Sequence, residues 1–151
     1  YVDINYKEFM SGQSTTAGNP PINVASVVTP GYTSPFTANA AINAKFPLGM
    51  GNARLNARVG YTYEDGKYSF TSTIATPYND ALKGGNRNVI DAQISVDRIA
   101  LGGAEAEVKI WGKNLTNSHD FVRGVDFGQL GFAGGYFAEP RTYGMTLGVK
   151  F

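Results

Sequence analysis

The chain has 151 residues, of which 42% are apolar and 17% charged, with a formal net charge of +1 and no cysteine. Absence of cysteine excludes thiol catalysis, Cys-ligated zinc and disulfides, and the balanced charge argues against nucleic acid as a partner. No apolar run approaches the roughly 20 residues that a spanning helix needs, so any membrane insertion must use strands.

Alternation of apolar and polar residues predicts six strands, and one face of each is apolar. In chain order the segments are 1–9, 36–47, 53–64, 89–99, 105–115 and 141–151. In the last segment the apolar face comprises Tyr143, Met145, Leu147, Val149 and Phe151. Trp111 breaks the pattern because it falls among the polar positions of its segment. Alternation alone is equally typical of a soluble antiparallel sheet with one wet face.

The connections between the predicted strands fall into two classes. Short glycine-containing turns are expected at 48–52 and 100–104, whereas the connections near 10–35, 65–88 and 116–140 are far longer than hairpin loops usually are. Because antiparallel strands alternate in direction, the short turns lie at one end of the sheet and the long loops at the other. This asymmetry is typical of outer-membrane β-barrels, whose apolar face meets lipid and whose polar face lines a wet lumen.

The C-terminal third carries a specific set of motifs. It contains the stretch Trp111-Gly112-Lys113-Asn114-Leu115-Thr116-Asn117, then Asp126-Phe127-Gly128, Gly131-Phe132 and Gly134-Gly135-Tyr136, then Glu139-Pro140-Arg141-Thr142-Tyr143-Gly144, and finally Phe151. In order and spacing these motifs resemble the C-terminal end of a TonB-dependent outer-membrane receptor. The resemblance begins at about Ile110, and the upstream hairpins are compatible with it.

The resemblance implies an antiparallel transmembrane barrel of about 22 strands, filled by an N-terminal plug, in the bacterial outer membrane. Its implied function is TonB-dependent uptake of a scarce nutrient such as a ferric siderophore, without a cofactor. Residues 1–151 would be the C-terminal segment of that barrel, about its last quarter, with the plug, the TonB-contacting segment and the earlier strands absent. The implied partners are the remaining strands, the plug, the TonB complex, the barrel-assembly machinery and lipid.

Candidate site residues are few. Five aromatic residues in the last long loop could contact a ligand at the barrel mouth, although packing of the loop against itself and its neighbours is the favoured interpretation: Phe121, Phe127, Phe132, Tyr136 and Phe137. Phe151 matches a terminal aromatic that serves as an assembly signal in such barrels. His119 beside Asp120 offers too few ligands for a metal, and no serine stands in a nucleophile-elbow context, so we expect neither a metal site nor catalysis.

Two alternatives remain at this point. A passive porin or an outer-membrane enzyme would have the same strands, and a soluble lipocalin-like binding module would have the same alternation with its apolar face inside. Asn114-Leu115-Thr116 also fits a glycosylation sequon. We interpret its Asn and Thr as strand-end hydrogen-bonding residues instead.

Overall fold

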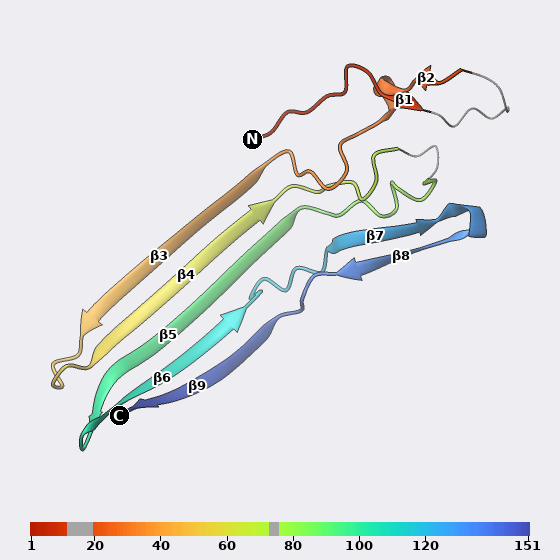
Figure 1. Ribbon diagram of the computed structural model, residues 1–151. Coiled ribbons are helices and arrows are strands. Elements are labelled where there is room, and N and C mark those ends of the chain that lie inside the picture. The colour runs from red at the N-terminus through yellow and green to blue at the C-terminus, as the bar shows by residue number, and fades with distance from the viewer. Residues whose placement is uncertain (12–19, 73–75) are drawn as a thin grey trace. The chain divides into compact units, whose positions relative to one another are not determined.

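The computed structural model describes residues 1–11, 20–72 and 76–151, and its sheets are antiparallel (Figure 1). Five strands form the main sheet in the order β3-β4-β5-β6-β9. Their bounds are Thr37–Pro47, Arg54–Glu64, Arg87–Leu101, Ala104–Lys113 and Thr142–Lys150. No helix in this part of the chain is long and apolar enough to cross a membrane.

The chain divides into two compact units. The sheet unit spans 38–64, 87–119 and 139–151, and the loop unit takes the described parts of 1–37, 65–86 and 120–138. Five of the six predicted strands are confirmed as the five strands of the main sheet, with ends shifted by two residues or fewer.

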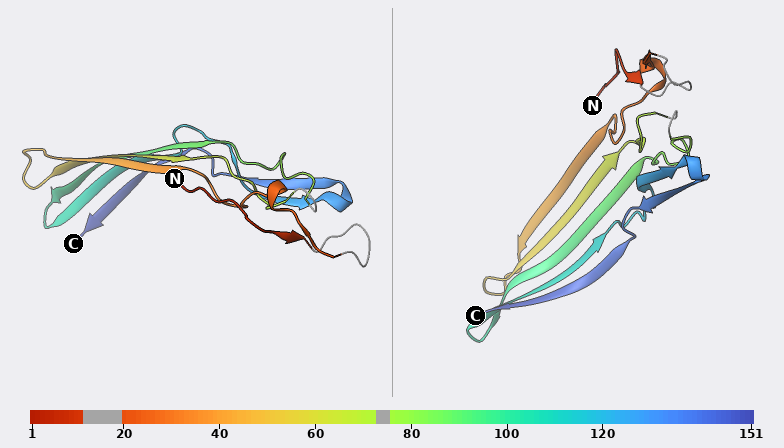
Figure 2. Two further views of the ribbon diagram at one scale, coloured as in Figure 1. Left: turned by 90° about the horizontal axis from the view of Figure 1, so that it is seen from above. Right: turned by 45° about the vertical axis from the view of Figure 1, so that its right-hand side comes forward.

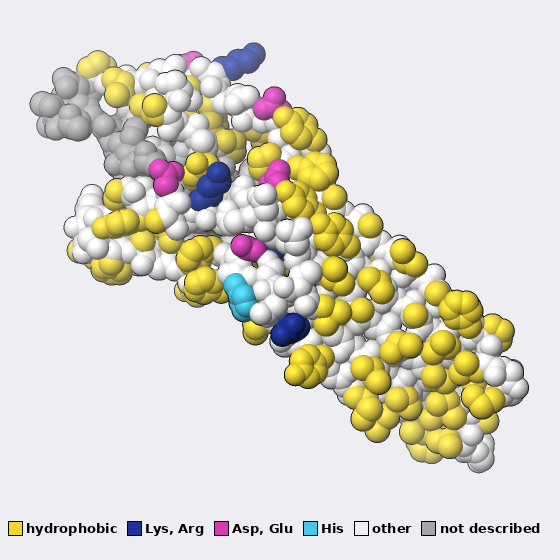
Figure 3. All heavy atoms as spheres, turned by 180° about the vertical axis from the view of Figure 1, so that it is seen from behind, with side chains coloured by type: hydrophobic (Ala, Val, Ile, Leu, Met, Phe, Trp, Pro, Cys, Tyr) yellow, Lys and Arg dark blue, Asp and Glu magenta, His cyan; other side chains and the backbone are white. Residues whose placement is uncertain are grey.

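Register keeps the two faces of the main sheet distinct across strands. Ala57 pairs with Ile94, Ile94 with Ile110, and Ile110 with Met145, so apolar residues stand side by side from β4 to β9. Ile94 is 46% exposed, Ile110 57% and Met145 63%. Figure 3 shows apolar side chains gathered over this face of the sheet. The apolar face is therefore continuous and is left uncovered by the described residues.

A β-bulge in β5 preserves this separation near the turn end of the sheet. The register shifts between Val96, which pairs with Val108, and Ile99, which pairs with Ala106. Arg98, inside the bulge, has a left-handed φ of 54°. The extra residue changes the alternation by one, so Ile99 and Leu101 join the apolar face although they have the opposite parity to Ile94.

The main sheet is open and curved. Its edges are β3 and β9, and the described residues form no closed barrel. The views in Figure 2 show the strands following a curve rather than a plane. Short turns join β3 to β4 and β5 to β6, and the second uses Gly102 and Gly103, both with positive φ, which suits a tight hairpin.

The loop unit contains only short elements. These are β1 (Met10–Ser11), β2 (Ile22–Asn23), the 3-10 turns η1 (Ala25–Val27) and η2 (Gly128–Leu130), and the hairpin strands β7 (Phe121–Phe127) and β8 (Phe132–Phe137). β1 pairs with β2, and β7 pairs with β8. Backbone bonds from Thr29 to Thr71 and from Tyr32 to Tyr68 join two of its segments.

Two sequence predictions need correction in this unit. The predicted strand at 1–9 is wrong, since none of these residues is in a strand and β1 begins only at Met10. The Val2 N–H donates to the Pro35 carbonyl and the Phe9 N–H to Asn23 Oδ1, so these donors serve loop contacts instead of a ladder. The connection near 116–140, expected to be a loop, contains the β7–β8 hairpin. Its glycines obscured the alternation by which strands are recognised.

Candidate functional site

The polar face of the main sheet contains a hollow of about 720 Å³, which we call the polar-face hollow. Most of the residues around it have polar parity, and they come from all five strands: Asn39, Ala41, Arg58, Gly60, Thr62, Asp91, Gln93, Lys109, Trp111, Lys113 and Thr146. Ala40, Tyr61, Ala92 and Gly112 complete the lining. A single hollow bounded by five adjacent strands means that the sheet curves around its polar side.

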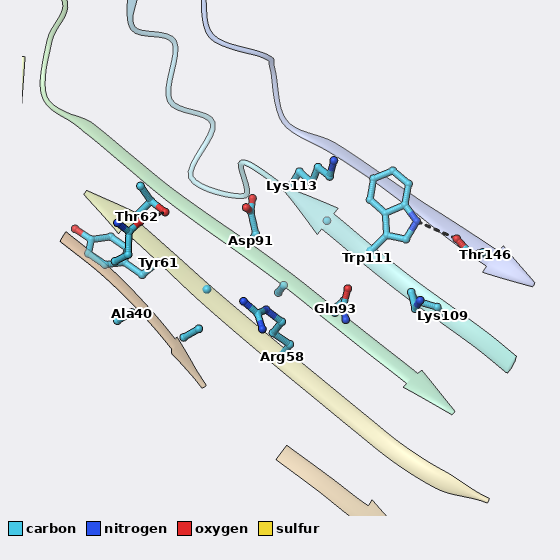
Figure 4. A pocket seen from close by; sticks show the side chains of 15 residues that line it. Ala40, Arg58, Tyr61, Thr62, Asp91, Gln93, Lys109, Trp111, Lys113 and Thr146 are labelled. Carbon is cyan, nitrogen blue, oxygen red and sulfur yellow. Dashed lines mark hydrogen bonds between the residues drawn. The ribbon is translucent and has the colours of Figure 1, made fainter. Parts of the chain in front are cut away.

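One register row forms the floor of the polar-face hollow. Arg58 of β4 pairs with Gln93 of β5, which pairs with Trp111 of β6. Figure 4 shows Gln93 lying between Arg58 and Lys109. Arg58 donates from Nη1 to Asn43 Oδ1 at 3.0 Å, and Thr62 Oγ1 donates to Asn39 Oδ1 at 2.9 Å. These bonds tie β3 to β4 and hold the side chains along one wall.

The Trp111 side chain is held in position on this polar face by β9. Its indole N–H donates to Thr146 Oγ1 at 3.3 Å, and the register places Gly144 opposite it. A Cβ added at Gly144 would come within 2.7 Å of the indole ring, so the ring occupies the space that a side chain would take. The break in alternation at Trp111 thus reflects an aromatic covering a strand glycine.

Basic residues predominate around the hollow. Its lining holds Arg58, Lys109 and Lys113 against the single acidic residue Asp91. Asp91 Oδ1 accepts the Asn114 N–H at 2.8 Å, and Lys109 Nζ lies 3.1 Å from Glu107 Oε1, in an ion pair whose side chains are 31% and 42% exposed. The hollow therefore favours negative charge.

The Asn114–Asn117 motif organises the end of β6. Asn114, only 5% exposed, donates from Nδ2 to the carbonyls of Ser118 and Glu139 and accepts the Ser118 N–H on Oδ1. Thr116 Oγ1 donates to the Asn88 carbonyl at 2.6 Å. The interpretation of this Asn and Thr as strand-end hydrogen-bonding residues is confirmed.

The five aromatic residues of the predicted ligand set lie on the β7–β8 hairpin, and none lines the polar-face hollow. The rings of Phe121 and Phe137 stack with centroids 4.6 Å apart, and those of Phe127 and Phe132 lie 4.9 Å apart. Each pair is also opposed in the register of the hairpin. Tyr136 is 66% exposed. Four of the five rings thus pack across the hairpin.

Several polar side chains of the loop unit form hydrogen bonds with its backbone. Asn79, 1% exposed, accepts the Phe70 N–H and donates to the Phe70 carbonyl. Ser69 Oγ donates to the Leu82 carbonyl and accepts the Gly124 N–H, while Asp126 accepts the Tyr78 N–H at 2.8 Å. The Gly124–Ser69 and Tyr78–Asp126 bonds hold the described residues of 65–86 to the β7–β8 hairpin.

His119 is exposed in the sheet unit, and the Asp120 carbonyl accepts the Ala138 N–H in the loop unit. Across 1–11, 20–72 and 76–151, no three His, Cys, Asp or Glu residues are grouped so that they could hold a metal ion. Phe151 follows β9 and its side chain is fully exposed.

Arg58, Gln93, Lys109 and Lys113 occupy polar positions of the alternating segments, but alternation within each strand does not identify a site there. Two residues could have signalled the site. Gly60 leaves a polar position of its strand without a side chain, and Trp111 puts a large aromatic ring at a polar position of another. Compared with known proteins, the chain matches no family model, no curated protein and no solved structure.

Proposed function

We propose that this chain forms part of the wall of a bacterial outer-membrane β-barrel of the TonB-dependent receptor type, acting in the uptake of a scarce nutrient such as a ferric siderophore. In this proposal the apolar face of the main sheet meets lipid and the polar face lines the lumen. The observation that carries it is the curvature of the sheet around its polar side, seen in the polar-face hollow.

Curvature distinguishes a membrane barrel from a soluble one. A soluble lipocalin-like barrel curves around its apolar face, because that face forms its core and binding cavity. Here residues from Asn39 of β3 to Thr146 of β9 bound one hollow on the polar side. The apolar face is consequently convex, as in a barrel whose outside is lipid.

The distribution of apolar residue types supports the same orientation. Tyr61, Tyr63 and Tyr143 lie toward the end of the sheet from which the long connections leave, while Phe46 and Phe151 lie toward the short turns. The positions between them on this face are aliphatic, among them Ile42, Val59, Ile94, Ile110 and Leu147. An aliphatic band between two aromatic rims is the pattern expected of a wall that crosses a bilayer.

The contacts of Asn114 add support for the receptor type. Asn114 belongs to the first element of the resemblance, and its side chain bonds the carbonyl of Glu139, which begins the Glu139–Gly144 element. Two motifs separated by about 25 residues in the sequence are therefore in contact. The plug, the other strands, the TonB complex, the assembly machinery and lipid are the partners that this proposal requires.

The experiment is an accessibility measurement on spin-labelled full-length protein in lipid bilayers. Labels at Leu55, Ala57, Ile94 and Leu147 should respond to a lipid-soluble quencher, whereas labels at Asn56 and Thr146 should respond to a water-soluble one. Asn56 and Thr146 are matched controls because each is adjacent in the chain to a lipid-facing position. If the labels at Asn56 and Thr146 responded to the lipid-soluble quencher and the other four to the water-soluble one, the result would support a soluble module and contradict the membrane proposal.

A further inference from the structure

We infer that the outer edge of β8 is an interaction surface on which the β8 strand of a second copy of this chain adds in antiparallel pairing. The inference goes beyond the proposed function, because it concerns the β7–β8 hairpin of the loop unit and requires neither a membrane nor a transported ligand. It rests on the direction of the backbone groups, on the openness of the edge and on the order of large and small side chains along it.

The backbone of β8 has polar groups on the side away from β7. In an antiparallel pair, residues alternate between those whose N–H and C=O groups face the neighbouring strand and those whose groups face away. The Gly124 N–H donates to Ser69 Oγ, so the pair of Gly124 with Gly135 is of the second kind. The Ala138 N–H donates inward to the Asp120 carbonyl, which gives the same alternation. The outward groups of β8 therefore belong to every second residue: Ala133, Gly135 and Phe137.

In the described parts of the chain, no segment pairs with this outer edge. β8 pairs only with β7, and the described residues of 65–86 bond β7 instead, through Ser69. Figure 1 shows β8 on the far side of β7 from that segment. β8 also lacks the proline and the charged residues that commonly protect an exposed edge, and the irregularity in register lies on β7. An open edge of this kind is a template for an added strand.

The side chains of β8 match those of a second β8 in the antiparallel register centred on Gly135. The Gly135 residues of the two copies pair with each other. Ala133 of one copy pairs with Phe137 of the other. Gly134 likewise pairs with Tyr136, so each of these aromatic side chains faces a small residue. The three hydrogen-bonded pairs provide about six backbone bonds, and the segment is self-complementary, as a two-fold interface requires.

Gly134 leaves the space that the Tyr136 ring of the second copy needs. A Cβ added at Gly134 would meet no heavy atom within 4 Å, and Tyr136 is 66% exposed. An aromatic ring that covers a glycine on a neighbouring strand stabilises the pairing of the two strands. The same arrangement occurs within this chain, where the Trp111 ring covers Gly144.

The contact is small, which determines how strong the dimer can be. Each copy contributes a strand of six residues and three aromatic side chains that are more than half exposed: Phe132, Tyr136 and Phe137. Such a contact buries less than the roughly 1,200 Å² at which stable interfaces begin. The dimer should therefore be reversible and appear only at high protein concentration.

The first test is sedimentation equilibrium of the full-length protein in detergent micelles at increasing protein concentration. We expect a monomer–dimer equilibrium. Gly134→Lys should raise the dimer dissociation constant at least tenfold, because the lysine takes the place of the tyrosine ring of the second copy and brings a charge into the contact. Gln129→Lys adds the same charge at the exposed turn of the same hairpin and should leave the constant unchanged.

The second test fixes the register by disulfide crosslinking. Residues 1–151 contain no cysteine, so single cysteines can be introduced without a background from this chain. Gly134 and Tyr136 would form a non-hydrogen-bonded pair with Cα atoms about 4.5 Å apart, which a disulfide can span. A mixture of Gly134→Cys and Tyr136→Cys should therefore give a crosslinked dimer. Either variant alone should crosslink far less, because identical residues are two positions out of register.

Four results would overturn the inference: a full-length protein that stays monomeric, equal weakening by Gly134→Lys and Gln129→Lys, equal crosslinking in the mixture and in the single variants, or slow amide exchange at Gly135 in the monomer. The last result would mean that another segment of the protein covers the edge. None of these outcomes depends on which face of the main sheet meets lipid, so the accessibility measurement tests the barrel proposal separately.

Discussion

The sheet unit and the loop unit of this protein are held together by different means. In the sheet unit, backbone ladders join β4, β5, β6 and β9, and few apolar residues are buried: Ala53 and Val89. In the loop unit, side chains such as Asn79 and Ser69 bond the backbone around buried Leu82. The sheet therefore depends on its surroundings to cover its side chains, whereas the loop unit contains a small polar core of its own.

The largest loss of stability is expected from a charged side chain on the apolar face of the sheet unit. Ile94→Arg, near the middle of β5, should destabilise the protein in a bilayer by roughly 2–4 kcal/mol, because an arginine there cannot be solvated by lipid. Unfolding by denaturant from lipid vesicles measures this loss. The matched control is Gln93→Arg, one residue away on the polar face, which should be mild. Similar losses for both variants would contradict two differently solvated faces.

An intermediate effect is expected inside the loop unit. Asn79→Ala leaves the N–H and carbonyl of Phe70 without their side-chain partner in a buried position, and should cost about 1–3 kcal/mol. Hydrogen exchange should then accelerate at Phe70 and Gly124 but not in β5 or β6. Asn86→Ala, which removes one exposed acceptor of the Gly66 N–H, should change little. Equal acceleration throughout β5 would mean that the two units do not open independently.

The smallest effect on stability is expected at the end of the sheet. Phe151→Leu should change the stability of assembled protein by about 1 kcal/mol or less, since the ring is fully exposed and the change retains apolar area. As an assembly signal, however, Phe151 should be needed for a normal yield of folded barrel in the outer membrane. Tyr143→Leu, an aromatic at the other end of β9 with the same parity as Phe151, is the control. Equal yields for Phe151→Leu and the unaltered protein would leave Phe151 a packing residue alone.

The same division between units explains what the sequence could predict. Alternation located β3, β4, β5, β6 and β9 because one face of each strand is apolar over nine or more residues. Alternation at Val2, Ile4 and Tyr6 predicted a strand that is not there. Alternation describes side chains only, and a strand also needs a neighbouring strand to bond its backbone. The bulge at Arg98 was missed because a non-glycine residue with positive φ leaves no local sequence signal.

Prediction of sites was weaker for a related reason. The aromatic residues of the β7–β8 hairpin were recognisable by type, but their pairing depends on a hairpin that glycines concealed. The polar-face hollow depends on register, which brings Arg58, Gln93 and Trp111 into one row from positions 58, 93 and 111. Register is a property of pairs of strands, so reading each strand separately did not bring this row together.

Strand direction in the main sheet limits what can extend it. The order β3-β4-β5-β6-β9 alternates in direction, so both edge strands, β3 and β9, point the same way (Figure 1). Identical copies placed around a common axis would therefore meet at parallel seams, within an otherwise antiparallel wall. Closure by antiparallel neighbours alone requires an odd number of additional strands between β9 and β3. Parity thus excludes a ring of these five-stranded sheets related only by rotation about the barrel axis as an all-antiparallel barrel.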